Sequence, residues 1–218
     1  IRIPLGVNTK KFIASNQTNK NKIRDFLKIP RDAILIGSFQ KDGIGWGEGT
    51  EPKLIKGPDI FIKTLSLLAK KGLPIYALLT GPSRGYVKEG LKKNNIPFYH
   101  CFVSDIDDLP FFYQALDIYL ITSREEGGPM GLMESMSCGI PVVTTRVGMA
   151  EDVIQKNIPC AISNEIDSNI LAEKIEFVLE TFYKNKEKSQ KIIRKQILKF
   201  DWEEVAKQYW DKVYKDLI

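Results

Sequence analysis

The sequence predicts a doubly wound α/β domain, in which helices cover both faces of a parallel sheet of about six strands. Two observations lead to this prediction. Apolar segments such as AILIGSF at 33–39 and IYALLTG at 75–81 are continuous rather than alternating, which is typical of strands buried on both faces. These short runs also alternate along the chain with segments of helical periodicity, as expected for successive βαβ units.

The elements follow from local signals. Residues 14–22 (ASNQTNKNK) are strongly polar and predict a loop. Pro58 suits the first position of a helix over 58–70, and Gly72 fits its C-terminal cap. Further helices are predicted over 84–94, shortly after Asp107–Asp108, and over 130–138. The six strands are expected at 33–39, 75–81, 98–103, 117–122, 141–145 and 159–163.

From residue 166 to the end the pattern is helical. The last segment, 200–218, places several large side chains at helical spacing, and we expect them to be packing residues rather than a ligand site. They are Trp202, Val205, Tyr209, Val213 and Leu217.

Composition narrows the function classes. The chain has 218 residues, of which 43% are hydrophobic, so it can bury a substantial core. No run approaches the roughly 18 apolar residues of a membrane span. Three cysteines, far apart in the sequence, fit a reducing compartment, and the single histidine excludes a His-based metal cluster. Because the chain starts at Ile1 rather than Met, we expect it to be part of a longer protein.

Positive charge is concentrated in one segment. The net charge is +5, and residues 183–199 carry seven Lys or Arg and one Glu. A basic helix of this kind can bind phosphates of nucleic acids or lipids. No interleaved aromatics or nucleic-acid motif accompany it, so a solvated helix face is the preferred interpretation and no nucleic-acid partner is expected.

The segment SREEGGPMGLMESMSCGIPVVTT, residues 123–145, is the strongest candidate for a site. It follows the strand at 117–122, and ligands of open parallel sheets bind at the carboxyl ends of the strands. Gly127 and Gly128 permit close backbone approach, and Pro129 precedes a helix. The first amides of that helix, at Met130 and Gly131, would have no intrahelical acceptor and would suit a diphosphate.

Two carboxylates flank this anion site. Glu134 would lie about one turn into the helix, where it could accept hydrogen bonds from the hydroxyls of a ribose. Glu126 precedes the helix and could reach a second ring beyond the diphosphate. The alternative is structural: Glu134 would be a surface helix residue, and Glu126 would complement the helix dipole.

The wider pattern resembles retaining glycosyltransferases of the GT-B fold, specifically family 4. The resemblance rests on Glu126 and Glu134, which have seven residues between them, followed by SMSCGIPVV at 135–143. It extends to LIKGPDIFIKTLSLL at 54–68, LTGPS at 79–83, RVGMAEDVI at 146–154 and the terminal FDWEEVAKQY. It implies that the whole of 1–218 is the C-terminal, Rossmann-like, donor-binding domain. In this reading 1–22 holds the interdomain linker and a loop, and 200–218 is a crossover helix.

The resemblance also implies roles for individual residues. Glu134 would bind the nucleotide ribose, Glu126 would contact the donor sugar as the catalytic residue, and Lys56 would neutralise the diphosphate. Gly128, Pro129, Met130 and Gly131 would form the backbone anion site. Phe102 and Val103 would lie beside the base of a UDP-sugar or GDP-sugar. No metal or other cofactor is expected, and Asp105 and Asp107, although spaced Asp-x-Asp, are not expected to bind one.

The chain departs from the family in residues 40–53, QKDGIGWGEGTEPK. Relatives have an arginine just after the first strand, whereas this chain has Gln40 and a glycine-rich insertion. Lys41 or Lys53 could replace the missing cation, and Lys41 is the preferred candidate. Trp46 could cover the donor or an acceptor, or could merely belong to a flexible loop. Arg84, after the second strand, is another candidate for a position near the phosphates, but a surface residue is the preferred interpretation.

The predicted activity is that of the intact enzyme: transfer of a sugar, with retention of configuration, from a nucleoside-diphosphate sugar to a glycan, lipid or small-molecule acceptor. This chain alone is expected to bind donor without efficient transfer. A non-catalytic nucleotide-sugar-binding subunit and a GT-B nucleotide-sugar epimerase are the alternatives. The expected location is the cytoplasm, with peripheral association at the inner face of the membrane left open.

Overall fold

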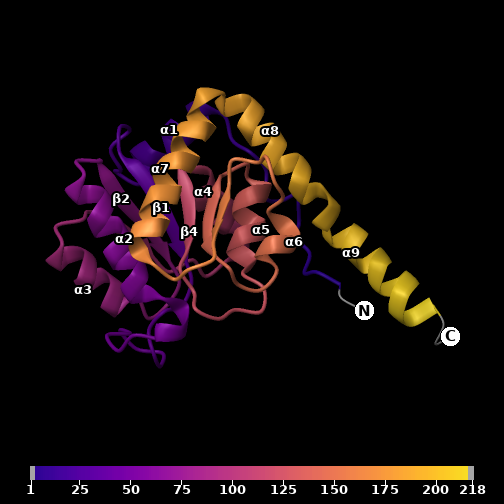
Figure 1. Ribbon diagram of the computed structural model, residues 1–218, viewed down its shortest axis with the longest axis horizontal. Coiled ribbons are helices and arrows are strands. Elements are labelled where there is room, and N and C mark those ends of the chain that lie inside the picture. The colour runs from indigo at the N-terminus through magenta and orange to yellow at the C-terminus, as the bar shows by residue number, and fades with distance from the viewer. Residues whose placement is uncertain (1–2, 216–218) are drawn as a thin grey trace.

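A single parallel sheet organises the part of the chain that the structure describes, residues 3–215 of a computed structural model (Figure 1). Its strand order is β3-β2-β1-β4-β5-β6, and all neighbouring pairs are parallel. The predicted fold class and all six predicted strands are confirmed. The strands are β1 (Ile34–Phe39), β2 (Ile75–Thr80), β3 (Phe98–Cys101), β4 (Ile118–Ile121), β5 (Val142–Thr145) and β6 (Ala161–Ser163).

Helices cover both faces of this sheet. Successive residues of β4 alternate between two cores: Ile118 and Leu120 belong to one, and Tyr119 and Ile121 to the other. The first core packs under α2 (Pro58–Lys70), α3 (Gly85–Lys93) and α7 (Ser168–Lys184), and Figure 1 shows α7 in front of the strands. The second core packs under α1 (Gln17–Phe26), α4 (Leu109–Gln114), α5 (Met130–Ser137) and α8 (Lys186–Ile197). Short helices α6 (Ala150–Val153) and α9 (Trp202–Tyr209) complete the described set.

The direction of winding reverses between β1 and β4. From β1 the chain continues to β2 and β3 on one side, and from β4 it continues to β5 and β6 on the other. At such a point the loops after the two central strands diverge and leave room for a ligand. The residues that follow β1 and β4 therefore occupy the binding edge of the sheet.

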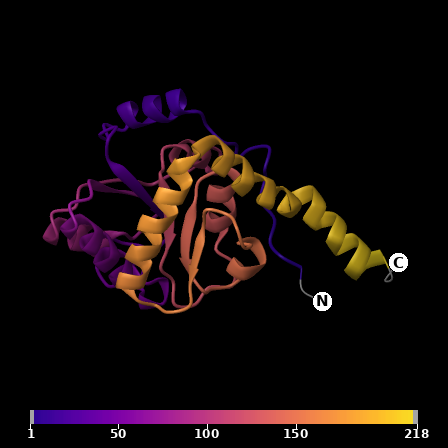
Figure 2. The same ribbon diagram turned by 45° about the horizontal axis from the view of Figure 1, so that its top comes forward.

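The loop predicted at 14–22 is wrong, because α1 begins at Gln17 (Figure 2). Asn16 caps this helix by accepting a hydrogen bond from the Asn19 amide at 2.8 Å. The helix packs with charged side chains rather than a purely apolar stripe. Lys20 and Arg24 are buried and both pair with Asp117, at 2.5 Å and 2.6 Å. A polar sequence thus forms a packed helix because its cations have a buried partner on β4's N-terminal side.

The N-terminal segment lies against the residues that precede and begin α9. The Val7 amide donates to the Phe200 carbonyl at 2.9 Å, and the Trp202 amide donates to the Val7 carbonyl at 3.1 Å. Thr9 Oγ1 donates to Asp201 at 2.5 Å. The segment that resembles a linker is therefore fixed along the start of α9, and Figure 1 shows α9 projecting away from the sheet.

The expected packing role of the terminal aromatics is largely wrong. Val205 is buried, but Trp202 and Trp210 are about half exposed, at 50% and 52%. Tyr209 and Val213 are also exposed, while Leu217 lies outside the described residues. After α9 the helix continues as a π-helical turn, Trp210–Tyr214. Among residues 3–215, no helix has both the length and the apolar character needed to cross a membrane.

Candidate functional site

A pocket of about 220 Å³ opens at the binding edge of the sheet. Four of the predicted site residues line it together: Lys41, Phe102, Val103 and Glu134. They come from the ends of β1 and β3 and from α5, so segments far apart in sequence meet here. The other lining residues are Phe39, Gln40, Thr80, Gly81, Pro82, Leu109 and Tyr113. The pocket therefore combines a carboxylate, a cation and an exposed aromatic ring.

Glu134 is buried rather than on the helix surface, so the structural alternative for this residue is wrong. Only 7% of it is exposed, and its Oε2 accepts a hydrogen bond from the Tyr113 hydroxyl at 2.7 Å. Burial raises the pKa of Glu134, and the bond from Tyr113 partly offsets that rise. One carboxylate oxygen is thus held by Tyr113, which orients the carboxylate at the pocket.

The start of α5 lies close to the switch point. Pro129 has extended backbone angles and α5 begins at Met130. The Leu132 amide donates to the Pro129 carbonyl at 3.0 Å, whereas within residues 3–215 the amides of Met130 and Gly131 have no acceptor. A Cβ at Gly131 would lie 2.3 Å from the Tyr119 hydroxyl, so only glycine fits. That hydroxyl accepts from the Phe39 amide at 3.0 Å and so joins the end of β1 to α5.

Glu126 lies in the loop after β4 and pairs with Lys56. Lys56 Nζ is 2.7 Å from Glu126 Oε1, and Ser123 Oγ donates to Oε2 at 2.8 Å. Gly57 holds the neighbouring backbone in a left-handed conformation, with φ of +64°. The Thr122 hydroxyl donates to the Gly57 carbonyl at 2.8 Å. The Lys56–Gly57 turn is therefore fixed against the end of β4, beside the loop that carries Glu126.

Gly128 lies against the N-terminal segment. A Cβ at this position would lie 2.5 Å from the Leu5 side chain, so the loop before α5 and the segment near residue 5 are in close contact. An added Cβ at Gly127 would have nothing within 4 Å. The two glycines thus differ: the second is required by a neighbour, and the first is not.

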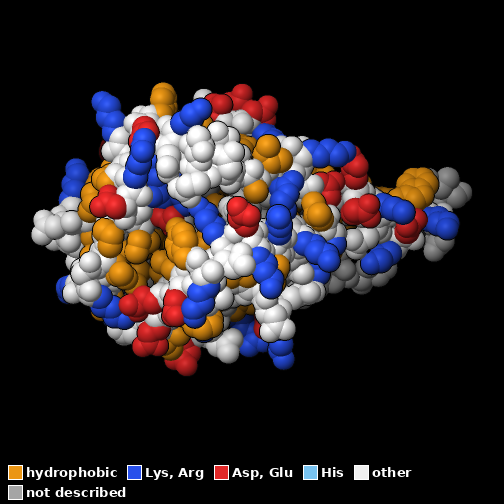
Figure 3. Space-filling model, turned by 90° about the horizontal axis from the view of Figure 1, so that it is seen from above, with side chains coloured by type: hydrophobic (Ala, Val, Ile, Leu, Met, Phe, Trp, Pro, Cys, Tyr) orange, Lys and Arg blue, Asp and Glu red, His pale blue; other side chains and the backbone are white. Residues whose placement is uncertain are grey.

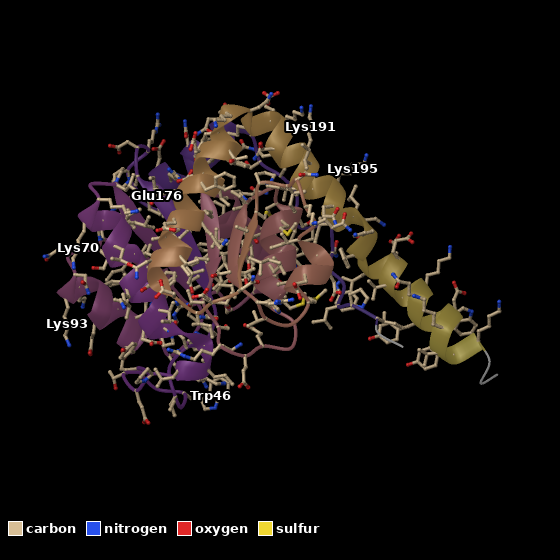
Figure 4. The ribbon with its side chains drawn as sticks, viewed as in Figure 1. Trp46, Lys70, Lys93, Glu176, Lys191 and Lys195 are labelled. Carbon is tan, nitrogen blue, oxygen red and sulfur yellow. The ribbon has the colours of Figure 1, made fainter. Side chains whose placement is uncertain are left out.

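The glycine-rich insertion is an anchored hairpin rather than a flexible loop. Gly43 pairs with Pro52 in an antiparallel bridge, and the amides of Gly85 and Tyr86 donate to the carbonyls of Glu48 and Gly49 at 2.6 Å and 2.8 Å. At its tip Trp46 is 85% exposed, and Lys41 Nζ lies 3.7 Å from the centre of its ring. Figure 4 shows Trp46 at the periphery of the molecule, at the bottom of the view.

Arg84 is not a surface residue, contrary to expectation. It is 1% exposed, and its Nε lies 3.0 Å from Oδ1 of Asp42, which is equally buried. Burial lowers the pKa of Arg84 and raises that of Asp42, and each charge opposes the shift of the other. Sequence reasoning missed Tyr113, Tyr119, Ser123 and Asp42. Tyr113, Tyr119 and Asp42 have partners 21 to 80 residues away, and no short motif links them, whereas Ser123 lies only three residues before Glu126 in the quoted segment.

The Asp105–Asp107 pair has local partners. Asp105 accepts a hydrogen bond from the Asp107 amide at 2.8 Å, and Asp107 pairs with Lys11. Within residues 3–215 no three Asp, Glu, His or Cys side chains gather in a group that could hold a metal ion. Metal independence of the reaction stays a prediction.

A doubly wound parallel sheet with a pocket at its switch point is the architecture of a GT-B, Rossmann-like glycosyltransferase domain. The chain belongs to the family "Glycosyl transferases group 1", which residues 52–197 match. It is 30% identical over 156 residues to the lipopolysaccharide core biosynthesis mannosyltransferase LpsB of Rhizobium meliloti (strain 1021). That match covers 68% of this chain and 41% of LpsB, so the matched region spans less than half the length of that relative.

Two solved structures show the same fold. Anabaena Alr3699/HepE, in complex with UDP and glucose, superposes with a TM-score of 0.73 at 20% identity, over 97% of this chain and 55% of HepE. The C-terminal domain of the glycosyl transferase group 1 family protein LpcC from Francisella tularensis superposes with a TM-score of 0.61 at 21% identity. It covers 94% of this chain and 98% of that domain.

Proposed function

We propose that this chain is the C-terminal, donor-binding half of a retaining glycosyltransferase of family 4. The observation that carries the proposal is the pocket at the switch point, where Glu134, Lys41, Phe102 and Val103 meet. The likeness to HepE, a structure with UDP and glucose, supports a nucleoside-diphosphate sugar as the ligand. The near-complete overlap with the C-terminal domain of LpcC supports the assignment to the C-terminal half.

The chemistry assigns each group a part of the donor. Glu134 accepts hydrogen bonds from the ribose hydroxyls, and the exposed Phe102 with Val103 borders the base. The free amides of Met130 and Gly131 bind the diphosphate at the start of α5, where the helix dipole favours negative charge. Lys56 and Lys41 supply positive charge, and Glu126 accepts from a hydroxyl of the transferred sugar.

Transfer requires the leaving nucleoside diphosphate to be stabilised as its charge grows. Fixed amides and a nearby ammonium group do this without reorganisation at the moment of bond breaking. We assign that role to the α5 amides and Lys56 and propose that no metal takes part. The acceptor, a glycan, lipid or small molecule, would be bound mainly by an N-terminal half, so this chain alone binds donor without efficient transfer.

Peripheral membrane association stays a prediction, with one surface to test. Lys188, Lys191 and Lys195 are exposed along one side of α8, on the part of the molecule far from Trp46 (Figure 4). Figure 3 views this side and shows several basic side chains along the base of the protruding helix. Co-sedimentation with vesicles containing anionic phosphatidylglycerol, compared between the wild type and K191E/K195E, tests it.

The central test is thermal unfolding of the 218-residue chain with UDP, GDP and ADP. A ligand at 100 times its dissociation constant adds about 2.7 kcal/mol, which corresponds to a rise in Tm of roughly 5 to 11 °C at this size. We expect one nucleotide to raise the Tm of the wild type and of Glu173→Ala, which replaces an exposed glutamate of α7. Glu134→Ala should lose most of the rise. A wild type that no nucleotide stabilises would contradict the proposal.

A further inference from the structure

One buried guanidinium joins the ends of two strands. Arg84 Nη1 donates to the carbonyls of Ser38 and Gln40, at the end of β1, at 2.7 Å and 2.9 Å. The same nitrogen donates to the carbonyl of Thr80, at the end of β2, at 2.9 Å. Arg84 is the largest of the fully buried side chains in the described chain. A planar group with several fixed donors can hold such carbonyls in one arrangement, which a lysine cannot do.

The charge partner of Arg84 is equally unusual. Asp42 is 1% exposed, and Arg84 Nε lies 3.0 Å from its Oδ1. Burying an ion pair costs several kcal/mol per ion before their attraction repays it. A hydrophobic pair would fill the same space at lower cost, so a pair of this kind is expected where it fixes a particular geometry.

The residues held by this pair lie at the proposed nucleotide pocket. Gln40 and Lys41 follow β1, and Gly81 and Pro82 follow β2, and all four line the pocket. The two segments are in close contact, since a Cβ at Gly81 would lie 2.7 Å from the Gln40 carbonyl oxygen. The arginine therefore acts on backbone that the ligand would touch, without itself reaching the pocket.

The turn that carries Arg84 is held by the hairpin on its other side. Ser83 has a positive φ of 55°, an uncommon conformation for a residue other than glycine. Its hydroxyl donates to the carbonyls of Gly45 and Gly47, both at 3.1 Å. Asp42 stands at the base of the same hairpin, so the hairpin, the turn and the two strand ends form one connected unit.

We infer that Arg84 and Asp42 are positioning residues that fix the wall of the nucleotide pocket formed by the ends of β1 and β2. The inference rests on the proposed function. Here Gln40 takes the place of the arginine expected just after the first strand, and the buried Arg84 instead holds the backbone that presents Lys41 and Gly81. Loss of its fork of hydrogen bonds would displace both segments by fractions of an ångström, which is enough to weaken binding.

Arg24 provides a matched control at the opposite edge of the same sheet. It is 2% exposed, donates to the carbonyls of Ala115 and Ala33 at 3.0 Å and 2.9 Å, and pairs with Asp117. Arg84→Lys and Arg24→Lys therefore remove the same kind of buried fork, but only the first lies at the pocket. We expect both to lower the Tm, because each leaves buried carbonyls without donors.

Titration calorimetry measures the affinity of each variant for a nucleoside diphosphate. The ligand is UDP or GDP, whichever stabilises the wild type, and the temperature is one at which both variants are folded. Arg84→Lys should raise the Kd by about tenfold and Arg24→Lys by less than about threefold. Equal losses of affinity, or none in Arg84→Lys, would overturn the inference while leaving the proposed function standing. A wild type that binds neither nucleotide would overturn both.

Asp42→Asn keeps the shape of the side chain and provides a second variant if Arg84→Lys does not fold. It too should weaken nucleotide binding, by about tenfold. Hydrogen exchange gives a readout that needs no ligand. Amides at 39–41 and at 80 and 81 should exchange faster in Asp42→Asn than in the wild type, while those of β5 stay unchanged. Uniform acceleration over the whole sheet would show a purely global effect and would contradict a positioning role.

Discussion

Lys56 and Glu126 pair with each other at 2.7 Å, although they are proposed to serve neighbouring parts of the donor. Lys56 comes from the turn before α2, and Glu126 from the loop after β4, 70 residues later. The side chains are only partly exposed, at 22% and 18%, so solvent screens their attraction incompletely. A bound diphosphate would therefore compete with Glu126 for the ammonium group of Lys56.

This competition predicts opposite effects for the two residues. Glu126→Gln releases Lys56 and should tighten binding of a free nucleoside diphosphate by roughly 2- to 5-fold, which corresponds to about 0.5 to 1 kcal/mol. Lys56→Met should weaken it by about tenfold. Titration calorimetry with UDP or GDP measures both. Weaker binding in both variants would mean that Glu126 supports the diphosphate site instead of competing with it.

The Lys56–Gly57 turn should tolerate no side chain at Gly57. A Cβ there would lie 1.9 Å from the Thr122 carbonyl oxygen. Gly72 also has a positive φ but has nothing within 4 Å of an added Cβ. Gly72→Ala should therefore lower the free energy of unfolding by about 1 to 2 kcal/mol, which is the cost of the left-handed backbone alone. Gly57→Ala should lower it by more than about 3 kcal/mol, because the added Cβ also meets the Thr122 carbonyl. Urea unfolding compares them, and equal costs would refute the contact with Thr122.

Asp117 should make the chain sensitive to acid. Burial alone would raise the pKa of this carboxylate, but Lys20, Arg24 and a hydrogen bond from Tyr183 lower it to about 2. The folded pKa lies below the unfolded one, so this stabilisation is complete above about pH 4 and is lost as the pH falls toward 2. It is worth about 2 kcal/mol.

The predicted loss of stability at low pH can be tested by comparing the wild type with Asp117→Asn. The difference between their free energies of unfolding should narrow by about 2 kcal/mol between pH 4 and pH 2, because only the wild type has a carboxylate to protonate. Urea unfolding at several pH values gives both curves. A difference that stays constant over this range would mean that Asp117 has an ordinary pKa.

The projecting C-terminal helix should contribute little through its aromatics. Trp210 is 52% exposed and Val205, on the same helix, is 1% exposed. Trp210→Ala should change the free energy of unfolding by no more than about 0.5 kcal/mol, and Val205→Ala should cost about 2 kcal/mol. The reverse order would show that the aromatic face is packed within this chain.

Trp46 should report on Lys41. If Lys41 turns from the indole ring to the diphosphate, the cation leaves the ring face and the tryptophan emission changes. Titration with the bound nucleotide should give a fluorescence signal that is lost in Trp46→Phe and in Lys41→Met. Trp202→Phe is the control and should keep the signal. A signal that survives in Trp46→Phe comes from elsewhere and removes the assignment of Lys41.

The fold was predictable because its signals are local and repeated. Continuous apolar runs identify the strands, and Pro58 lies at the first position of α2, as expected. The segment 14–22 was not predictable, because the burial of Lys20 and Arg24 depends on Asp117, which is 97 and 93 residues away from them. No periodicity of apolar residues marks a helix that packs through ion pairs.

The candidate site divides in the same way. Glu134 could be placed at the binding edge because its position follows from one strand and one helix start. The depth of its burial could not be predicted, since that depends on Tyr113 in another helix. The environment of Arg84 was mispredicted because the carbonyls that surround it are 4 to 46 residues away and belong to two strand ends.

The pairing of Val7 with Phe200 and Trp202 has a consequence for building chimaeras. These hydrogen bonds hold the segment near residue 7 beside the start of α9, so two stretches almost 200 residues apart in sequence depend on each other. A hybrid that takes residues 3–12 from one relative and 198–205 from another would join two segments that do not match each other at this contact. Exchange of this unit between relatives should therefore succeed only when both segments are transplanted together.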